Sequence, residues 1–430
     1  MHAIAQISKN GLCTGCGTCA GICPCKAIVM QKSKGLMLPE VDEERCNRCG
    51  FCIASCPGHG VDFDSLNSSI FQRKPTNVLL GNYSKCYVGH ANDSDIRYYS
   101  SSGGIATRLL VFALERGFID GVLVVKMKKS KPLEPLPFIA RTKEEIISAS
   151  KSKYCPVPIN EALRQIISED GRYAVVGLPC HIHGVRKAER TVSALEKRIV
   201  LHVGLMCSHT VDFHGTDFLL DKMHIRKDEV TELNYRGMGS PGMMSIRCRS
   251  GSGMKIPYIG NWNAYWPVFS SFFFTPMRCL TCPDETNELA DLSLGDAWLP
   301  EFRHERSGKS IIVTRTKVGE EILALAISEG IISVKPACPE EVEHSQAVPL
   351  KFKKEDFGRR LDIFKSLGKA VPSFTPKRNP SRSIITSFRI FFSQVNSQAS
   401  SNSYVKNMLV HVPFPLFRLY YGIYKLLSMI

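Results

Sequence analysis

Short apolar runs alternate with amphipathic segments through the middle of the chain. Residues 105–116 place apolar side chains at helical spacing, and residues 122–125 form a short apolar run typical of a buried strand. The same order recurs around residues 173–177 and 199–207, and residues 311–333 complete a strand–helix–strand unit. This alternation predicts an α/β domain with a mainly parallel sheet, in which ligands bind beyond the carboxyl ends of the strands.

A turn of small residues precedes the first of these helices. Ser100 to Gly104 lead into the helix that is expected to start at Ile105. The free N–H groups and the positive dipole end of such a helix start suit a phosphate or a flavin carbonyl. The same residues are also common as plain helix caps, so the sequence leaves both roles open.

Residues 1–64 follow a cysteine pattern instead of an apolar one. Two runs of the form C-x2-C-x2-C-x3-C-P occur, and each cysteine of the second lies 33 positions after its counterpart in the first. The first run is Cys13, Cys16, Cys19, Cys23, and the second is Cys46, Cys49, Cys52, Cys56. This spacing is typical of two-cluster ferredoxins. The pattern therefore predicts an α+β ferredoxin-like domain that holds two 4Fe–4S clusters.

The spacing also divides the eight cysteines between the two clusters. Three cysteines of each run wrap one cluster, and the fourth leaves on a helix and ligates the other cluster. The sets are then Cys13, Cys16, Cys19 and Cys56 for cluster one, and Cys46, Cys49, Cys52 and Cys23 for cluster two. A pair of zinc knuckles is the alternative, but zinc takes its ligands in two separated pairs, which these runs do not supply.

Composition narrows the class of protein. The chain has 430 residues, which favours two to four domains, and its 17 cysteines are too many for an ordinary enzyme without metal centres. The opening residues MHAIAQISKNGLC lack the apolar stretch of a secretory signal. We therefore expect cluster ligation in a reducing compartment, the cytoplasm, and no disulfide framework.

The charge balance points to anionic partners without choosing among them. Lys and Arg outnumber Asp and Glu by 55 to 40, a net charge of +15. Such an excess favours a nucleic acid, a membrane surface or a phosphate-bearing cofactor. The basic residues are not interleaved with a recognised nucleic-acid motif, so we expect no nucleic-acid binding.

Four further cysteines lie where chemistry is expected. Cys180 follows the apolar run at 173–177, Cys207 ends the run at 199–207, and Cys279 and Cys282 form a CxxC pair. Two strand-end cysteines and one CxxC can ligate a third cluster, bind a zinc ion or remain buried thiols. Spacing alone leaves these three possibilities open.

Six sequence blocks occur in order between residues 86 and 335. They are SSSGGIATRLLVFALERGFIDGVLVV, SKYCPV, YAVVGLPCHIHGVRKA, HVGLMCSHT, NYRGMG and CLTCPDETNELADLSLGDAW. Together they resemble the β-subunit family of coenzyme F420-reducing hydrogenases and dehydrogenases, beneath an amino-terminal ferredoxin module. The resemblance implies an iron–sulfur flavoprotein oxidoreductase that holds FAD and exchanges hydride with a deazaflavin coenzyme.

The resemblance also implies site residues. It places a third 4Fe–4S cluster on Cys180, Cys207, Cys279 and Cys282. It places the flavin contacts on Ser101, Ser102, Gly103, Gly104, Lys153 and Tyr154. The sequence identifies no catalytic residue beyond these contacts.

The carboxyl-terminal segment departs from this family. Residues 363–430 contain nine Lys or Arg and no Asp or Glu, and their last stretch is rich in Phe, Leu and Tyr. Pro413 and Pro415 argue against a membrane-spanning helix. Such a segment can lie on a membrane surface or dock on protein, and both remain open. The Ser- and Asn-rich residues 393–403 are predicted to be a flexible tether.

These patterns divide the chain and set two hypotheses for its function. The division is 1–64 (ferredoxin), 65–85 (connector), 86–150 and 151–340 (two parts of the β-subunit domain) and 363–430 (tail). The leading hypothesis is an oxidoreductase that passes electrons between clusters, a flavin and a deazaflavin, a quinone or an organic substrate. The alternative is a non-catalytic subunit that wires a partner enzyme through its clusters. A redox partner protein or ferredoxin is expected in either case, and the inner face of the membrane is a second expected location.

Overall fold

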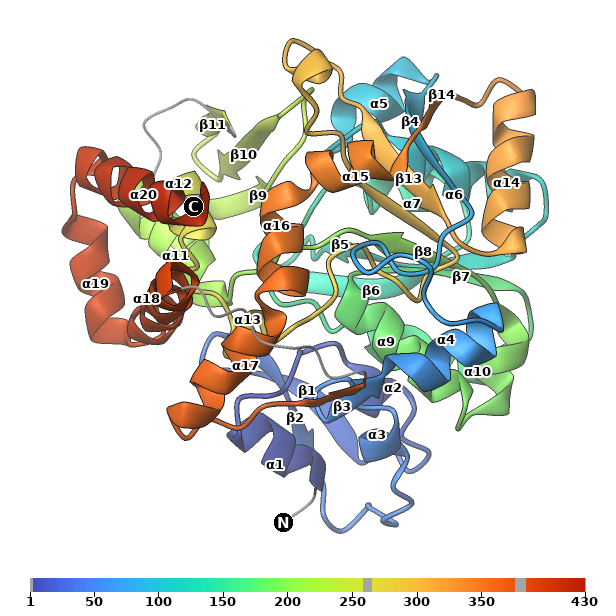
Figure 1. Ribbon diagram of the computed structural model, residues 1–430, viewed down its shortest axis with the longest axis horizontal. Coiled ribbons are helices and arrows are strands. Elements are labelled where there is room, and N and C mark those ends of the chain that lie inside the picture. The colour runs from blue at the N-terminus through green and yellow to red at the C-terminus, as the bar shows by residue number, and fades with distance from the viewer. Residues whose placement is uncertain (1–2, 258–264, 376–383, 430) are drawn as a thin grey trace.

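The computed structural model describes residues 3–257, 265–375 and 384–429. Its centre is an eight-stranded sheet in the order β14-β4-β13-β12-β8-β7-β5-β6 (Figure 1). The strands are β4 (Lys85–Ala91), β5 (Gly121–Met127), β6 (Pro135–Ala140), β7 (Tyr173–Gly177), β8 (Ile199–Leu205), β12 (Leu292–Asp296), β13 (Ser310–Thr314) and β14 (Ile332–Ala337).

The α/β class is confirmed, but the prediction of a mainly parallel sheet is wrong. Only the pairings β12–β8, β8–β7 and β7–β5 are parallel. The other four pairings are antiparallel, at β5–β6 and at β12–β13, β13–β4 and β4–β14. The parallel centre is the part built from strand–helix–strand units, and the chain adds antiparallel strands on both sides of it.

Helices cover both faces of the parallel centre. On one face Leu123 and Val175 pack with α8 (Leu163–Ser168), α9 (Pro179–Glu189) and α10 (Ser193–Arg198). On the other face Val122 and Val124 pack with α6 (Ile105–Glu115), α7 (Lys143–Ser148) and α14 (Lys317–Ser328). Successive residues of β5 therefore point to opposite faces, and both faces are apolar because both are covered.

The ferredoxin domain lies below this sheet in Figure 1. It contains α1 (Ala3–Lys9), α2 (Thr18–Gly21), β1 (Ile28–Ser33), β2 (Leu36–Val41), α3 (Phe51–Ala54) and β3 (Gly60–Asp62). β1 and β2 form an antiparallel hairpin, and β3 pairs in parallel with β15 (Ser373–Thr375). The predicted connector 65–85 is helical at its start, because α4 (Phe63–Phe71) extends into it.

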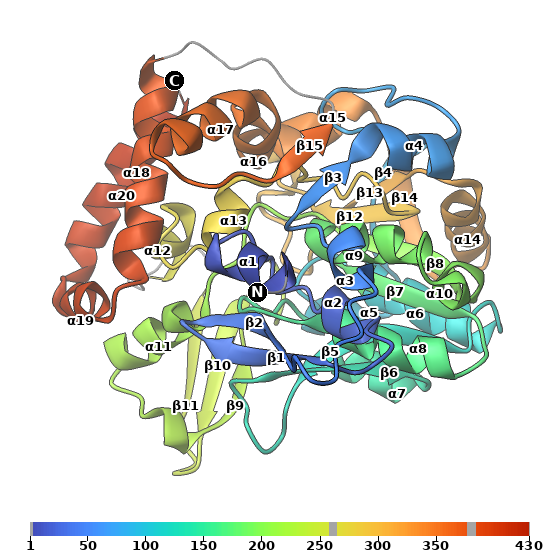
Figure 2. The ribbon, with the colours of Figure 1, turned by 90° about the horizontal axis from the view of Figure 1, so that it is seen from below.

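A second region continues from the central sheet. It holds the antiparallel strands β9 (Val230–Asn234), β10 (Met243–Cys248) and β11 (Gly253–Pro257) with α11 (Phe213–Lys222), α12 (Tyr265–Ser270) and α13 (Met277–Leu280). The chain then passes through β12 to β14 and through α15 (Pro339–Ser345), α16 (Ala347–Leu350) and α17 (Phe357–Ser366). α13 and α17 bring this second half of the chain against the ferredoxin domain (Figure 2).

Three helices end the chain on the side of α11 and α12 (Figures 1 and 2). They are α18 (Ile384–Ser400), α19 (Ser403–His411) and α20 (Phe414–Met429). The prediction of a flexible tether at residues 393–403 is wrong, because residues 393–400 form half of α18. Residues 376–383 and 430 of the predicted tail lie outside the described residues. Within the described part of the chain, no helix is both long and apolar enough to cross a bilayer.

Candidate functional site

The two amino-terminal cysteine loops have the same local geometry. Gly17 and Gly50 each precede a short helix with φ of 82°, a left-handed conformation that favours glycine. In the first loop the Gly15 N–H donates to Cys13 Sγ at 3.4 Å, and in the second the Arg48 N–H donates to Cys46 Sγ at 3.4 Å. Backbone donors aimed at sulfur stabilise thiolates that hold a cluster.

The structure gathers these cysteines into two sets. Cys13, Cys16, Cys19 and Cys56 are close enough for their charges to interact, and Cys52 interacts in the same way with Cys46, Cys49 and Cys23. These are the sets that the spacing predicts, with the fourth cysteine exchanged between the runs. Burial raises the pKa of Cys13 to about 12 and that of Cys56 to about 11. Thiolates in such surroundings need a nearby positive centre, which suits iron.

A third set forms at the carboxyl ends of the parallel strands. Cys180 lies at the start of α9 after β7, Cys207 follows β8, and Cys279 and Cys282 flank the end of α13. The charges of Cys207, Cys279 and Cys282 all act on Cys180, although the four residues span about a hundred positions. The Cys207 N–H donates to the Glu285 carbonyl at 2.9 Å, which ties the strand end to the loop after the CxxC pair.

Buried cations surround this third set. Lys353 is 2% exposed, and its ammonium donates to Cys282 Sγ at 3.5 Å and to the Asp284 carbonyl at 2.9 Å. Burial alone would lower the Lys353 pKa, but the charges of Cys282, Cys207 and Cys279 raise it overall. Arg360 is fully buried and donates to the carbonyl oxygens of Leu280 and Cys282. These cations offset the negative charge that four thiolates would bring.

The three thiol sets follow one another through the molecule. Cys19 of the first set interacts with Cys52 of the second, and Cys16 interacts with Cys180 of the third. Asn160 lies at this second junction, 1% exposed. Its N–H donates to the Cys16 carbonyl at 3.0 Å, and its side-chain amide donates to Thr18 Oγ1 at 2.8 Å and to the His181 carbonyl at 2.9 Å. The first set therefore lies between the other two.

Each of the three sets offers four cysteine thiols as possible ligands. In the described ranges, no three His, Cys, Asp or Glu side chains lie close enough together to hold a single metal ion. A 4Fe–4S cube carries its four thiolates on separate iron atoms, so they stand farther apart than the ligands of one zinc ion. The donor chemistry of four thiols in each set fits clusters.

The predicted Ser/Gly turn lies at the same edge of the sheet. β4 and β12 both run antiparallel to β13, so the carboxyl end of β4 shares an edge with those of β12, β8 and β7. The turn follows β4 and α5 (Ser94–Tyr99), and its Gly103 N–H donates to Ser310 Oγ at 3.0 Å. A Cβ on Gly103 would meet the Gly89 carbonyl at 2.8 Å, and one on Gly104 would meet Arg97 Cα at 2.9 Å. Both glycines are thus required for packing within the fold.

The two predicted flavin segments touch each other. Ser101 Oγ accepts a hydrogen bond of 2.8 Å from the Ser152 N–H, next to Lys153. Ser102 Oγ donates to the Lys309 carbonyl at 2.9 Å. The Ser100 hydroxyl is buried and has no hydrogen-bond partner in the described structure, so a ligand atom at this turn would satisfy it.

Lys153 and Tyr154 face different surroundings. The Lys153 ammonium donates to the carbonyl oxygens of Ala149, Ser150 and Lys151, and burial lowers its pKa to about 7. The Tyr154 ring packs 5.4 Å from that of Phe269, which stacks 4.1 Å from the His209 ring. His209 lies two residues beyond Cys207, so packed rings join the predicted flavin segment to the third thiol set.

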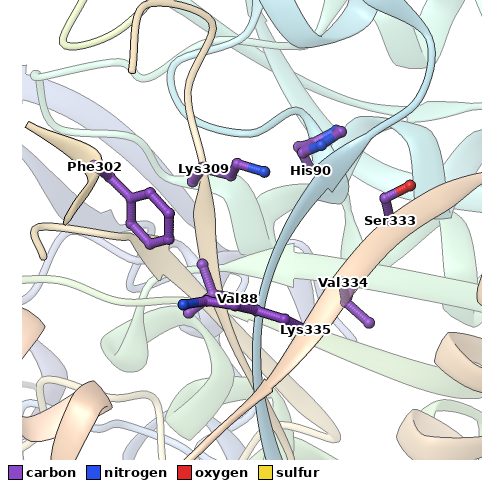
Figure 3. Close-up of a pocket in the computed structure, with 7 residues that line it drawn as sticks. All are labelled: Val88, His90, Phe302, Lys309, Ser333, Val334 and Lys335. Carbon is purple, nitrogen blue, oxygen red and sulfur yellow. The ribbon is translucent and has the colours of Figure 1, made fainter. Parts of the chain in front are cut away.

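A cavity of about 240 Å³ lies beside the turn (Figure 3). Its lining is Val88, His90, Phe302, Lys309, Ser333, Val334 and Lys335. Figure 3 shows the Lys309 side chain directed toward His90. The lining combines two lysines and a histidine with one aromatic ring, a set that suits an anionic group with a flat apolar part.

Sequence reasoning missed several of these residues. Lys353 and Arg360 lie in a basic stretch of the sequence that looks like solvated surface, and only the fold brings them to Cys282. Asn160 carries no motif at all. The His183 ring pairs with the buried Asp284 carboxylate at 2.8 Å. The signal for Lys353 would have been its place in a charged run that also carries buried apolar residues such as Phe352.

Comparison with known proteins covers most of the chain. Residues 86–164 and 170–340 match the amino- and carboxyl-terminal parts of the family described as coenzyme F420 hydrogenase/dehydrogenase, beta subunit. Residues 12–61 match the 4Fe–4S dicluster domain, which confirms the prediction of two clusters there.

Individual relatives agree with this family. The coenzyme F420 hydrogenase subunit beta of Methanosarcina barkeri is 30% identical over 64% of this chain and 89% of the relative. A coenzyme F420-dependent sulfite reductase of Methanocaldococcus jannaschii is 28% identical over 83% of this chain and 52% of the relative. A chain of the F420-reducing [NiFe] hydrogenase complex of Methanosarcina barkeri superposes with a TM-score of 0.54 at 26% identity, over 69% of this chain and 97% of that chain. The chain therefore belongs to the coenzyme F420 hydrogenase/dehydrogenase beta subunit family of oxidoreductases and carries a 4Fe–4S dicluster domain on its amino-terminal side.

Proposed function

We propose that this chain is a flavin-dependent oxidoreductase with three 4Fe–4S clusters in series. The observation that carries the proposal is the succession of three thiol sets, joined at Cys19–Cys52 and at Cys16–Cys180. When bound, clusters carry single electrons, and a flavin exchanges them for the electron pairs of a hydride. The chain itself supplies the ligands, the spacing and the charged surroundings.

The ligand sets of this proposal are the three groups of cysteines described above. The first is Cys13, Cys16, Cys19 and Cys56, the second is Cys46, Cys49, Cys52 and Cys23, and the third is Cys180, Cys207, Cys279 and Cys282. Cys49 of the second set is exposed, whereas Cys282 of the third is buried beside Lys353. We infer that a redox partner binds near the second set, and that the third set exchanges electrons with the proposed flavin inside the protein.

The flavin, FAD, is assigned to the sheet edge next to the third set. The proposed flavin site is lined by Ser101, Ser102 and Tyr154. The shape of the turn and of the segment beside it depends on Gly103, Gly104 and Lys153. The ring contacts Tyr154–Phe269 and Phe269–His209 support it, because they connect this region to the Cys207 loop. The buried Ser100 hydroxyl is a donor held ready for a ligand oxygen or nitrogen.

The proposed substrate is a deazaflavin of the coenzyme F420 type, since the relatives that the chain resembles are named for it. A quinone or an organic substrate is the alternative acceptor. The likeness to a subunit of a hydrogenase complex supports further protein subunits as redox partners, with a ferredoxin as the alternative. The second candidate function is a non-catalytic subunit that passes electrons to a partner enzyme through its clusters. The Lys153 ammonium favours it, because this group already donates to the backbone carbonyl oxygens of Ser150 and Lys151 and is not held in place for a flavin.

The same reasoning supports a division of the chain and a location. We propose residues 1–64 as the ferredoxin domain, 65–85 as the connector, 86–150 and 151–340 as the parts of the β-subunit domain, and 363–430 as the tail. None of the 17 cysteines forms a disulfide, which suits the reducing cytoplasm.

Iron and flavin content test the proposal. The wild-type chain, reconstituted anaerobically with iron, sulfide and FAD, should hold about twelve irons and one flavin. Cys180→Ala should retain about eight irons, because the third set loses a ligand. Cys86→Ala, a buried thiol of β4 outside the sets, is the matched control and should retain all of them.

Two results would count against it. Full iron content in Cys180→Ala would remove Cys180 from the ligands. Three clusters without flavin, in a chain that accepts electrons from a partner but reduces no deazaflavin, would establish the wiring subunit instead.

A further inference from the structure

Helix α18 buries its polar face and exposes its apolar face, the opposite of an ordinary surface helix. Its buried residues are mainly polar: Thr386, Arg389, Ile390, Ser393, Gln394, Asn396, Ser397 and Ser400. Five large apolar side chains of α18 are exposed: Ile384, Phe388, Phe391, Phe392 and Val395. Gln398 is the one large polar side chain of α18 exposed with them. A helix on a protein surface in water normally shows the reverse arrangement.

The buried polar face of α18 is firmly bonded to the body of the protein. Asn396 donates to the Ser271 carbonyl at 2.7 Å, and Ser397 donates to the Thr275 carbonyl at 2.6 Å. Ser400 Oγ accepts from the Phe274 N–H at 2.6 Å. The orientation of α18 is thus fixed by specific hydrogen bonds, and its apolar face is held outward.

Helix α20 continues the exposed apolar surface. Phe417 and Tyr424 bury one side of α20 at 4% and 5% exposure. A stripe at spacing three and four remains outside: Leu416, Leu419, Ile423 and Leu426, each more than half exposed. Tyr404 and Met408 of α19 are also exposed. The tail therefore docks on protein with one face and presents a second, apolar face to the outside.

The charge around this surface is one-sided. Arg389 and Lys406 pair with Asp356 and Asp221 of the body, and Arg418 and Lys425 are exposed on α20 beside its apolar stripe. No acidic residue occurs anywhere in residues 363–430. An apolar face bordered by cations complements a layer of acyl chains under phosphate groups.

We propose that the outer faces of α18, α19 and α20 form an anionic-membrane contact surface on which the protein lies in the headgroup plane. No described helix can span a bilayer, so the contact is peripheral. A phospholipid surface meets both requirements together, since its acyl boundary accepts Phe, Leu and Ile while its phosphates pair with Arg and Lys. The inference is independent of the proposed redox function.

Vesicle flotation of the full-length, cluster-loaded protein tests this contact. The vesicles are phosphatidylcholine alone and phosphatidylcholine mixed with phosphatidylglycerol, each at low and high salt. Wild type should float with the anionic vesicles at low salt and less at high salt. Val395→Ser with Leu419→Ser should weaken this partition roughly thirtyfold, and Lys425→Gln about fivefold.

The matched control is Val318→Ser with Leu325→Ser on α14. These side chains are 44% and 41% exposed, and α14 lies on the opposite side of the molecule from α18 to α20 in both Figure 1 and Figure 2. The control should float like wild type. Iron content and circular dichroism of both pairs should match wild type, because all four positions are exposed.

Three results would overturn the proposal. Wild type could ignore anionic vesicles at low salt, or the α14 pair could lose as much binding as the tail pair. Sedimentation could also show a dimer that the tail pair dissociates while vesicles are ignored, in which case a second copy covers this face.

Discussion

Replacing Lys353 by methionine removes the ammonium that contacts the proposed third cluster. Nζ lies 3.5 Å from Cys282 Sγ, and the charges of Cys207 and Cys279 also act on it. Methionine keeps much of the volume, so the packing against Phe352 and the neighbouring helices should survive. Reduction adds an electron to the centre, and a nearby positive charge favours that step. The variant should therefore have a lower reduction potential.

The size of the shift follows from Coulomb's law. Taking the added electron about 6 Å from the ammonium, at an effective dielectric constant of about 20, gives about 3 kcal/mol. For a one-electron couple this is a shift of about 120 mV toward more negative potential. The buried position of Lys353 leaves little water or salt to screen the effect.

Redox titration followed by electron paramagnetic resonance measures this shift in the full-length protein. The signal of the third cluster is the one that Cys180→Ala lacks, which separates it from the two amino-terminal clusters. The matched control is Lys354→Met with Glu288→Gln, because this removes an equally buried ammonium together with the carboxylate that it pairs with. The net charge near the centre stays the same, so its potential should stay close to wild type.

The outcome can refute the reasoning directly. A Lys353→Met titration that superimposes on wild type would show that the ammonium does not act on a redox centre at Cys282. An upward shift would have the wrong sign for any loss of positive charge. A shift of equal size in the control pair would trace the effect to local packing.

Three further perturbations have defined outcomes. Asn160→Leu removes two side-chain hydrogen bonds across the junction of the first and third sets, so the free energy of unfolding should fall by about 1–3 kcal/mol in denaturant titration. Electron transfer between these two sets, measured by stopped-flow, should also become slower. Gly184→Ala should cost about 1–3 kcal/mol, because its Cβ would lie 2.2 Å from Thr18 Oγ1, whereas Gly422→Ala in open space should cost nothing in the same thermal melt. Burial raises the pKa of Asp212 to about 8, so the folded state keeps a proton that the unfolded state releases near pH 4. The free energy of unfolding should then fall as pH rises from about 4 to about 8, and Asp212→Asn should flatten that slope in melts across this range.

The parts that could be predicted from sequence are those in which chemistry is local. The spacing of Cys13, Cys16 and Cys19 fixes a loop by itself, and the repeat 33 positions later identifies the second loop. The strand ends that carry Cys180 and Cys207 were also predicted, because apolar runs followed by a turn mark them. In each case a few consecutive residues contain the whole signal.

The parts that were missed depend on contacts between distant segments. β4, β13 and β14 join the sheet in antiparallel order, and no local pattern states which strand pairs with which. Lys353 reaches Cys282 across 71 positions, and Asn160 reaches Thr18 across 142. Residues 393–400 look like a tether because Ser, Asn and Gln usually face water, whereas here Asn396 and Ser397 donate to the carbonyl oxygens of Ser271 and Thr275.

This last reversal links the proposed membrane face to the third thiol set. α18 braces residues 271–275, and that segment leads directly into α13, whose end carries Cys279. α18 also packs against α17, which positions Arg360 beside Cys282. Lipid would therefore contact α18, the same helix that supports the segments carrying the third set of cysteines and Arg360. A helix with water on its outer side could keep its polar face outward. The polar face of α18 instead points inward, so this one helix has two roles. Its inner face makes hydrogen bonds that support the segment leading to Cys279, and its outer face provides the apolar surface for the proposed membrane contact.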